Sequence, residues 1–178
     1  MLSSSGYISP LRNNHRGLSI WIFVAGIALL MLGSILSAPL AAAAGHRTLA
    51  LIIYGAFSRL CHQIPDRSFF IAGHQFAVCA RCTGLYLGLT VVALCYPLVR
   101  SLRRTDTPPR RWLFAAAFPL LVDFGLGYFG LWENTHLSRF LTGVLLGSVA
   151  VFYVMPGLLD ISFREWRNLF TRKPVEIR

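Results

Sequence analysis

Four long apolar stretches constrain the fold of this chain more than any other feature. Each is close to the 20 or so helical residues that cross the hydrocarbon core of a bilayer. Backbone polar groups in lipid must be satisfied within the segment, so such stretches fold as helices. We therefore expect an all-α integral membrane protein, a four-helix bundle that forms a single membrane domain over residues 1–178. The expected spans are about residues 18–40, 76–99, 112–132 and 140–159.

Composition supports a protein that is solvated by lipid. Hydrophobic residues make up 55% of the chain and charged residues 13%, whereas soluble domains carry about 25% charged residues. The net charge is +10, but the basic residues flank the apolar stretches and do not form one face of a soluble domain. We expect the lipid bilayer as a partner and no nucleic acid. The sequence is compatible with a homo-oligomer, and it indicates no substrate.

The distribution of basic residues predicts the orientation. Sixteen of the 17 are arginine, and twelve fall on one side of a four-span arrangement. Basic residues favour the cytoplasmic side of a membrane, so we expect a multi-pass protein of the cell (inner) membrane with both termini in the cytoplasm. Residues 160–178 would then form a basic cytoplasmic tail. The five basic residues on the outer side are Arg47, Arg59, Arg67, Arg81 and Arg139.

A run of small residues and a short apolar segment lie at and after the end of the first stretch. The sequence "SAPLAAAAG" after it is also typical of a signal-peptide cleavage site. The apolar run of about 20 residues exceeds the usual signal-peptide core of 7–15, which favours a retained helix; cleavage would leave three spans. Residues 48–60 are apolar but too short to span. We expect them to form a short outer-face helix at the interface or against the bundle.

The segment "CHQIPDRSFFIAGHQFAVCARCTG", residues 61–84, holds three of the four cysteines and two of the five histidines. Two thiolates three residues apart at the start of a helix can reach one ion, and the helix N-terminus favours thiolates. A third cysteine and a histidine would complete the donor set of a tetrahedral zinc site. The segment therefore predicts an outward-facing Cys/His metal site, with zinc as the expected ion. Its candidate ligands are Cys61, His62, His74, Cys79 and Cys82.

Two other uses of these cysteines compete with metal binding. Exported cysteines usually form disulfides, although three outer cysteines leave one unpaired. The Cys79–Cys82 pair is also compatible with a membrane thiol-disulfide oxidoreductase that passes electrons between exported thiols and a lipid-soluble acceptor. Relay enzymes of that type generally need a second cysteine pair. Cys95 lies deep in the second stretch, where we expect a small buried hydrophobic residue.

Asp123 places a charge inside the third apolar stretch. Such a charge costs roughly 2.5–3.5 kcal/mol on insertion scales and usually has a partner. Arg81 and Arg139 are the candidate partners, and the resulting ion pair is either structural or functional. A channel or transporter based on Asp123 and Arg81 is a third hypothesis, which four spans without an inverted repeat disfavour. Glu133 and His136 follow in the outer loop, where we expect them to be solvated.

Small residues predict where two helices meet. Gly84 and Gly88 in the second stretch, and Gly143 and Gly147 in the fourth, are each four residues apart and lie at similar depth. Glycines at this spacing let helix backbones approach closely. The second and fourth spans are therefore expected to pack against each other.

The motifs "CHQxPxRSFF", "VCARCTGLYLG" and "LTGVLLG" resemble a bacterial membrane-protein family catalogued as domain of unknown function 2085. The resemblance covers roughly residues 50–155 and implies a membrane fold, but the family brings no known activity. Similar proteins carry Asp-Gly in the third span, whereas Asp123 is followed here by Phe124. The matching positions are Cys61, His62, Gln63, Arg67, Ser68, Cys79, Arg81, Cys82, Thr83, Gly84, Tyr86 and Gly88.

Overall fold

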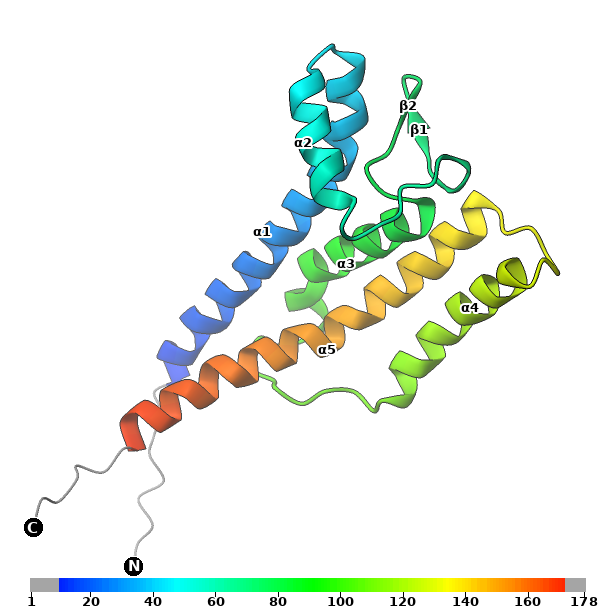
Figure 1. Ribbon diagram of the computed structural model, residues 1–178. Coiled ribbons are helices and arrows are strands. Elements are labelled where there is room, and N and C mark those ends of the chain that lie inside the picture. The colour runs from blue at the N-terminus through cyan, green and yellow to red at the C-terminus, as the bar shows by residue number, and fades with distance from the viewer. Residues whose placement is uncertain (1–9, 172–178) are drawn as a thin grey trace, which may run out of the picture.

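The chain is mostly helical, as the computed structural model in Figure 1 shows. The structure describes residues 10–171, and the side chains within residues 15–162. A short 3-10 turn, Pro65–Arg67, and a two-stranded hairpin lie between the second and third helices. The elements are α1 (Pro10–Ala43), α2 (Arg47–Phe57), β1 (Phe70–Ile71), β2 (His74–Gln75), α3 (Ala80–Val99), α4 (Arg111–Tyr128) and α5 (His136–Thr171).

Helices α1 and α3 run in opposite directions along each other. The indole Nε1 of Trp21 donates to the carbonyl oxygen of Ala93 (2.8 Å). Further along α1, the carbonyl oxygen of Ala28 accepts from Thr90 Oγ1 (3.1 Å). Because later residues of α1 meet earlier residues of α3, the two helices are antiparallel.

Helices α3 and α5 run in the same direction and approach closely through glycine. A Cβ added at Gly84, Gly88, Gly143 or Gly147 would lie within 3.0 Å of backbone atoms of the facing helix. The contacts advance along both helices together, so the two helices are parallel. The expected glycine contact between these two stretches is confirmed.

Helix α4 lies alongside α5 (Figure 1) and is not among the candidate membrane spans. It has 18 residues, and Arg111, Pro119 and Asp123 lower its hydropathy. Within the described part of the chain, three other helices are long and apolar enough to cross a membrane, so the count of four spans is not confirmed. These candidate spans are His15–Ala43, Ala80–Val99 and His136–Ser162.

Several helix boundaries differ from those expected. Helix α3 begins at Ala80, four residues later than residue 76, because residues 76–78 are not helical and turn their side chains into the core. Helix α4 ends at Tyr128, where the expected stretch reached residue 132. Helix α5 continues to Thr171, so the basic tail expected from residue 160 onward begins inside this helix. The rest of that tail, residues 172–178, lies outside the described residues.

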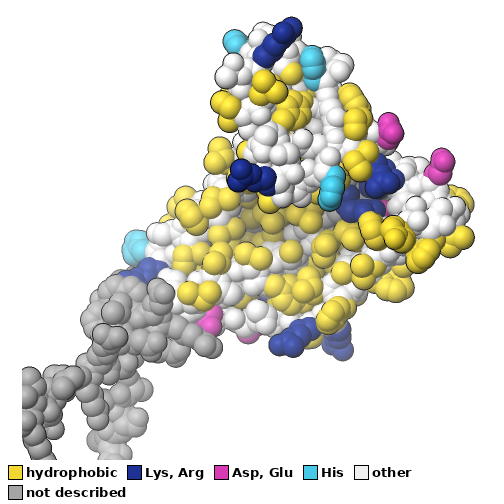
Figure 2. All heavy atoms as spheres, in the orientation of Figure 1, with side chains coloured by type: hydrophobic (Ala, Val, Ile, Leu, Met, Phe, Trp, Pro, Cys, Tyr) yellow, Lys and Arg dark blue, Asp and Glu magenta, His cyan; other side chains and the backbone are white. Residues whose placement is uncertain are grey.

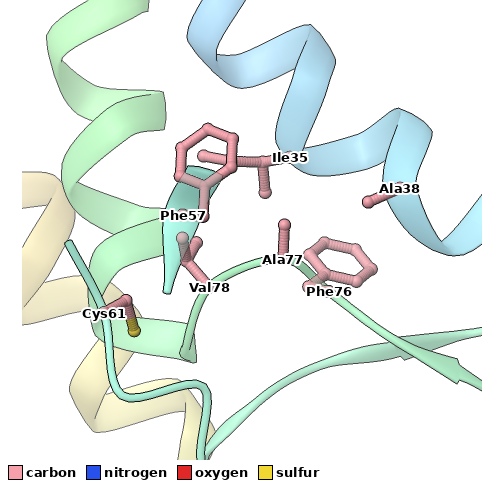
Figure 3. Close-up of a cluster of buried hydrophobic side chains, with 7 residues drawn as sticks. All are labelled: Ile35, Ala38, Phe57, Cys61, Phe76, Ala77 and Val78. Carbon is pink, nitrogen blue, oxygen red and sulfur yellow. The ribbon is translucent and has the colours of Figure 1, made fainter. Parts of the chain in front are cut away.

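Residues 47–79 form a small lobe at one end of the helices (Figure 1). Helix α2 packs back onto α1, as expected for this short apolar segment. The hairpin was not expected; its two-residue turn has positive φ at Ala72 (49°) and Gly73 (77°), as a type I′ turn requires. A buried cluster joins the lobe to α1 (Figure 3). It consists of Ile35, Ala38, Phe57, Cys61, Phe76, Ala77 and Val78.

Large apolar side chains cover much of the visible helix surface (Figure 2). Leu98 is 86% exposed, Phe114 71% and Phe118 66%. Soluble monomers rarely expose contiguous apolar surface of this extent. The outer surface of the helices is therefore suited to lipid.

Candidate metal centre

Three cysteine side chains meet at the start of α3, and we call them the thiol cluster. The Sγ atoms of Cys61, Cys79 and Cys82 all lie within 4.8 Å of one another. Cys79 is the N-cap residue of α3, Cys82 lies in its first turn, and Cys61 follows α2. The backbone N–H of Cys79 donates to Cys61 Sγ (3.2 Å). Two segments that are 18 residues apart thus supply three soft donors at one point.

Two glutamine side chains fix the path of the chain between these segments. Gln63 has a left-handed backbone conformation (φ 50°). Its Nε2 donates to the carbonyl oxygens of Tyr54 (2.9 Å) and Ala77 (2.7 Å). Gln75 Nε2 donates in turn to the carbonyl oxygen of Gln63 (2.7 Å). These bonds tie the end of α2 to the residues before α3, and so place Cys61 beside Cys79.

Hydrogen bonding favours a thiolate at Cys61. Cys61 is buried, Cys79 and Cys82 are half-buried, and all the cysteines are free thiols in the described part of the chain. Hydrogen bonds from the thiols of Cys79 and Cys82 lower the pKa of the Cys61 thiol, and burial acts in the opposite direction. A thiolate is the form of cysteine that binds metals.

Neither histidine that was expected as a fourth ligand joins the cluster. His62 and His74 are both exposed, and the group of close ligand atoms contains the three sulfurs alone among the described residues. Cys61 packs into the buried cluster, while the adjacent His62 side chain remains exposed at the surface. His74 is held in β2, opposite Ile71. The structure therefore supplies three protein donors where the sequence predicted four.

Cys95 is exposed, and the expectation of a buried residue was wrong. It lies in α3, 13 residues after Cys82, which is roughly 20 Å further along the helix. The residue is too far from the thiol cluster to share an ion with it.

A pocket of about 270 Å³ opens beside the thiol cluster. The three thiols form part of its wall, together with three arginines and several apolar or aromatic side chains. Figure 2 shows Lys and Arg side chains gathered where the lobe of residues 47–79 meets the helices. The arginines are Arg67, Arg81 and Arg139, and the apolar and aromatic residues include Leu60, Ile64, Phe124 and Tyr128. We call this space the arginine pocket.

One wall of the arginine pocket is held by an ion pair between α3 and α4. Arg81 Nη2 pairs with Asp123 Oδ2. Ser138 Oγ donates to the other carboxylate oxygen of Asp123 (2.7 Å), and Asn134 Nδ2 donates to the backbone carbonyl oxygen of Asp123. Arg139, the alternative partner, forms no ion pair with any described residue. Asp123 thus connects α3, α4 and the start of α5.

The segment that leads into α5 holds residues that were expected to be solvated and one pocket residue that was not expected. Glu133 and His136 are exposed, as expected, and the His136 ring lies 5.8 Å from that of Phe69. Asn134, which lines the pocket, was not predicted from the sequence, and neither was the paired role of Gln63 and Gln75. The only signal for any of them was the place of Gln63 in the Cys-His-Gln motif.

Comparison with known proteins identifies relatives but no activity. The family described as "Predicted membrane protein (DUF2085)" matches residues 61–153, which include the whole thiol cluster. An uncharacterized protein of Methanocaldococcus jannaschii is 37% identical over 119 residues, or 67% of this chain and 76% of its own length. An uncharacterized protein of Methanothermobacter thermautotrophicus is 34% identical over 91 residues, or 51% of this chain and 80% of its own length.

These two relatives are archaeal, so the description of the family as bacterial was too narrow. No solved structure matches the chain.

Proposed function

We propose that this chain, which belongs to the DUF2085 family of predicted membrane proteins, binds a transition-metal ion through Cys61, Cys79 and Cys82. The observation that carries the proposal is the convergence of three free thiols within 4.8 Å. Thiolates are soft ligands that select zinc, copper(I) or iron–sulfur clusters. Zinc is the ion we expect, because it accepts three or four thiolate and nitrogen ligands without a redox partner.

The arrangement supports an ion with one position open to the arginine pocket. Closed structural zinc sites have four protein ligands, whereas sites that exchange or activate a ligand have three. The thiol cluster offers three, and the arginine pocket adjoins it. A zinc ion bound there would polarise whatever occupies its fourth position. The chain's own contribution is to hold the thiols together and to line the approach with arginine.

We propose four membrane spans, with α4 as the fourth. Because α3 and α5 are parallel, the chain must cross back between them. Helix α4 has 18 residues, and at about 1.5 Å per residue it extends about 27 Å, close to the roughly 30 Å of the hydrocarbon core. The arginine-rich loop between α3 and α4 lies near the start of α1, where Gly17 faces Leu102.

This arrangement sets the proposed orientation. The arginine-rich loop also meets the middle of α5, where Tyr153 donates to the carbonyl oxygen of Pro109 (2.9 Å). Basic residues favour the cytoplasm, so we place both chain ends there, in the cell membrane. The thiol cluster then lies at the outer face.

Metal analysis of cysteine variants tests the proposed function. Protein purified without oxygen or chelator should hold one zinc ion per chain, and Cys61→Ser or Cys82→Ser should lose most of it. Cys95→Ser is the matched control, and its zinc content should equal that of the wild type. His62→Ala and His74→Ala should also retain zinc, because neither imidazole joins the cluster.

The competing thiol-disulfide oxidoreductase gives a different result in the same experiment. The purified protein would then hold no metal, and a Cys79–Cys82 disulfide would be reduced by an added thiol and reoxidised by an added quinone. Cys61→Ser would be nearly silent in that case, although Cys61 lies within the thiol cluster.

A further inference from the structure

The arginine pocket carries more positive than negative charge. Arg67, Arg81 and Arg139 line it, and Asp123, the carboxylate that pairs with Arg81, is already engaged. Neither Arg67 nor Arg139 forms an ion pair with a described residue. Arg139 is also close enough to Arg67 and Arg81 to interact electrostatically with both. Like charges gathered in a partly enclosed space repel one another unless an anion balances them.

Two buried polar atoms on the wall of the pocket have no partner. Arg81 Nε and Asn134 Oδ1 are buried and make no hydrogen bond to any described residue. Buried polar groups in native proteins are nearly always hydrogen-bonded. A ligand with an acceptor atom would satisfy Arg81 Nε, and a donor on the same ligand would satisfy Asn134 Oδ1.

The pocket has the size and walls for a small molecule. Its volume of about 270 Å³ is near the lower end of the range for ligand sites. Leu60, Ile64, Phe124 and Tyr128 supply apolar and aromatic surface beside the arginines. A guanidinium group can donate two parallel hydrogen bonds to a carboxylate or a phosphate, which an ammonium group matches less well.

We propose that the arginine pocket binds a small anion, a carboxylate or a phosphate, between Arg67 and Arg139 and against the thiol cluster. Recognition of the anion by arginine needs no metal. The proposal rests on the proposed function in one respect only, since in the zinc-loaded protein the anion would face the open coordination position. The anion comes either from solution or from the headgroup of an anionic lipid.

Competition between two alkylating reagents tests the anion site on metal-free protein. Iodoacetate and iodoacetamide have nearly the same shape, and in both the thiolate displaces iodide as the C–S bond forms and the C–I bond breaks. The ratio of their rates at one cysteine therefore cancels the exposure and thiolate fraction of that cysteine. We expect the iodoacetate-to-iodoacetamide ratio at Cys79 and Cys82 to exceed that of free cysteine in the same buffer. Mass spectrometry of each cysteine measures the rates.

Arginine variants supply the controls. Arg139→Gln and Arg67→Gln should each lower the rate ratio by roughly threefold or more, because a charge-assisted contact to the carboxylate is lost. Arg59→Gln removes the same charge from an exposed residue outside the pocket and should leave the ratio unchanged. Excess inorganic phosphate should slow iodoacetate at the thiol cluster of the wild type, and much less in Arg139→Gln.

An iodoacetate-to-iodoacetamide ratio in the wild type equal to that of free cysteine would overturn the anion site. The site would also be overturned if Arg59→Gln lowered the ratio as much as Arg139→Gln and Arg67→Gln do. Arg67 lies on an exposed turn, so its variant keeps the test valid if Arg139→Gln does not fold. The zinc content of the same preparations is measured separately. A raised iodoacetate-to-iodoacetamide ratio without zinc uptake would support the anion site and contradict the metal centre. Zinc uptake without a raised ratio would support the metal centre and contradict the anion site.

The source of the anion is found by repeating the measurement in bilayers. One preparation uses phosphatidylcholine alone, and the other adds phosphatidylglycerol. The cysteine of Thr135→Cys serves as the reference for the rate of iodoacetate alkylation. If phosphatidylglycerol slows iodoacetate at the thiol cluster more than at this reference, the anion is the lipid headgroup. Equal rates in both bilayers, with protection by inorganic phosphate, identify a soluble anion.

Discussion

Gln63 and Gln75 determine whether the three thiols meet. We predict that Gln63→Ala lowers zinc affinity by about tenfold or more, because positioning residues around a metal site typically contribute this much. The variant removes the bonds to Tyr54 and Ala77 that place Cys61 beside Cys79. Competition with a chelator measures the affinity. Glu133→Ala, at an exposed residue, is the control, and an equal loss there would contradict a specific role for Gln63.

Asp123 is the residue whose loss should most disturb the wall of the pocket. Asp123→Asn leaves Arg81 without its counter-charge, and we predict a loss of about 1–3 kcal/mol in the free energy of unfolding. Asp106→Asn removes the partner of Arg100 from an ion pair whose acidic side chain is 72% exposed. Exposed pairs contribute about 0–1 kcal/mol. Unfolding in detergent compares the two variants, and equal losses would argue against a structural role for the Arg81–Asp123 pair.

The lowered pKa of Cys61 predicts how many protons accompany metal binding. A thiol with a lowered pKa is already a thiolate above that pKa, so at neutral pH it has no proton to lose. Zinc binding at pH 7 should therefore release fewer than three protons per ion. Calorimetry in buffers of different ionisation enthalpy counts them. A release of three protons would show that Cys61 is a neutral thiol in the free protein.

At the scale of elements, the contact between α3 and α5 depends on the absence of side chains. Gly88→Leu should destabilise the fold by about 3 kcal/mol or more, because neither backbone can move aside without separating the helices. Gly26→Leu is the matched control, since no atom lies within 4 Å of a Cβ at that position. Thermal unfolding in detergent measures both variants. Similar losses in the two would mean that the glycine contact is not what joins α3 to α5.

The sequence predicted the helices better than the segments between them. Length and apolar composition indicated α1, α3 and α5, and the spacing of four glycines correctly paired α3 with α5. The start of α3 was misplaced because residues 76–78 are apolar and yet not helical, and hydropathy does not distinguish them from helix. The hairpin was missed because each strand has only two residues. Its sequence signal is limited to one turn.

At the scale of the whole molecule, the parallel direction of α3 and α5 links topology to the position of the site. In a background without native cysteines, a cysteine at Thr105 should resist membrane-impermeant thiol reagents in intact cells. A cysteine at Thr135 should react, because the loop between α4 and α5 lies at the same end as the thiol cluster. Labelling at Thr105 would reverse the orientation and move the cluster to the inner face.

The candidate site was only partly visible in the sequence. Spacing identified Cys61, Cys79 and Cys82, because two of them share a helix start and the third has a loop long enough to return. It could not exclude His62 and His74, since the direction of each side chain depends on the path of that loop. The arginine pocket was not foreseen, because its arginines come from three segments that only the fold brings together.

The proposed site consists of three thiolates that bind one ion whose fourth position is open. X-ray absorption at the zinc edge, on anaerobically purified and zinc-loaded protein, tests it most directly. We predict three sulfur ligands at about 2.3 Å and one oxygen or nitrogen ligand at about 2.0–2.1 Å. The light-atom ligand should persist in the His62→Ala/His74→Ala double variant, because it comes from solvent or a bound anion. Failure of the protein to bind zinc, or loss of that ligand in the double variant, would contradict the account.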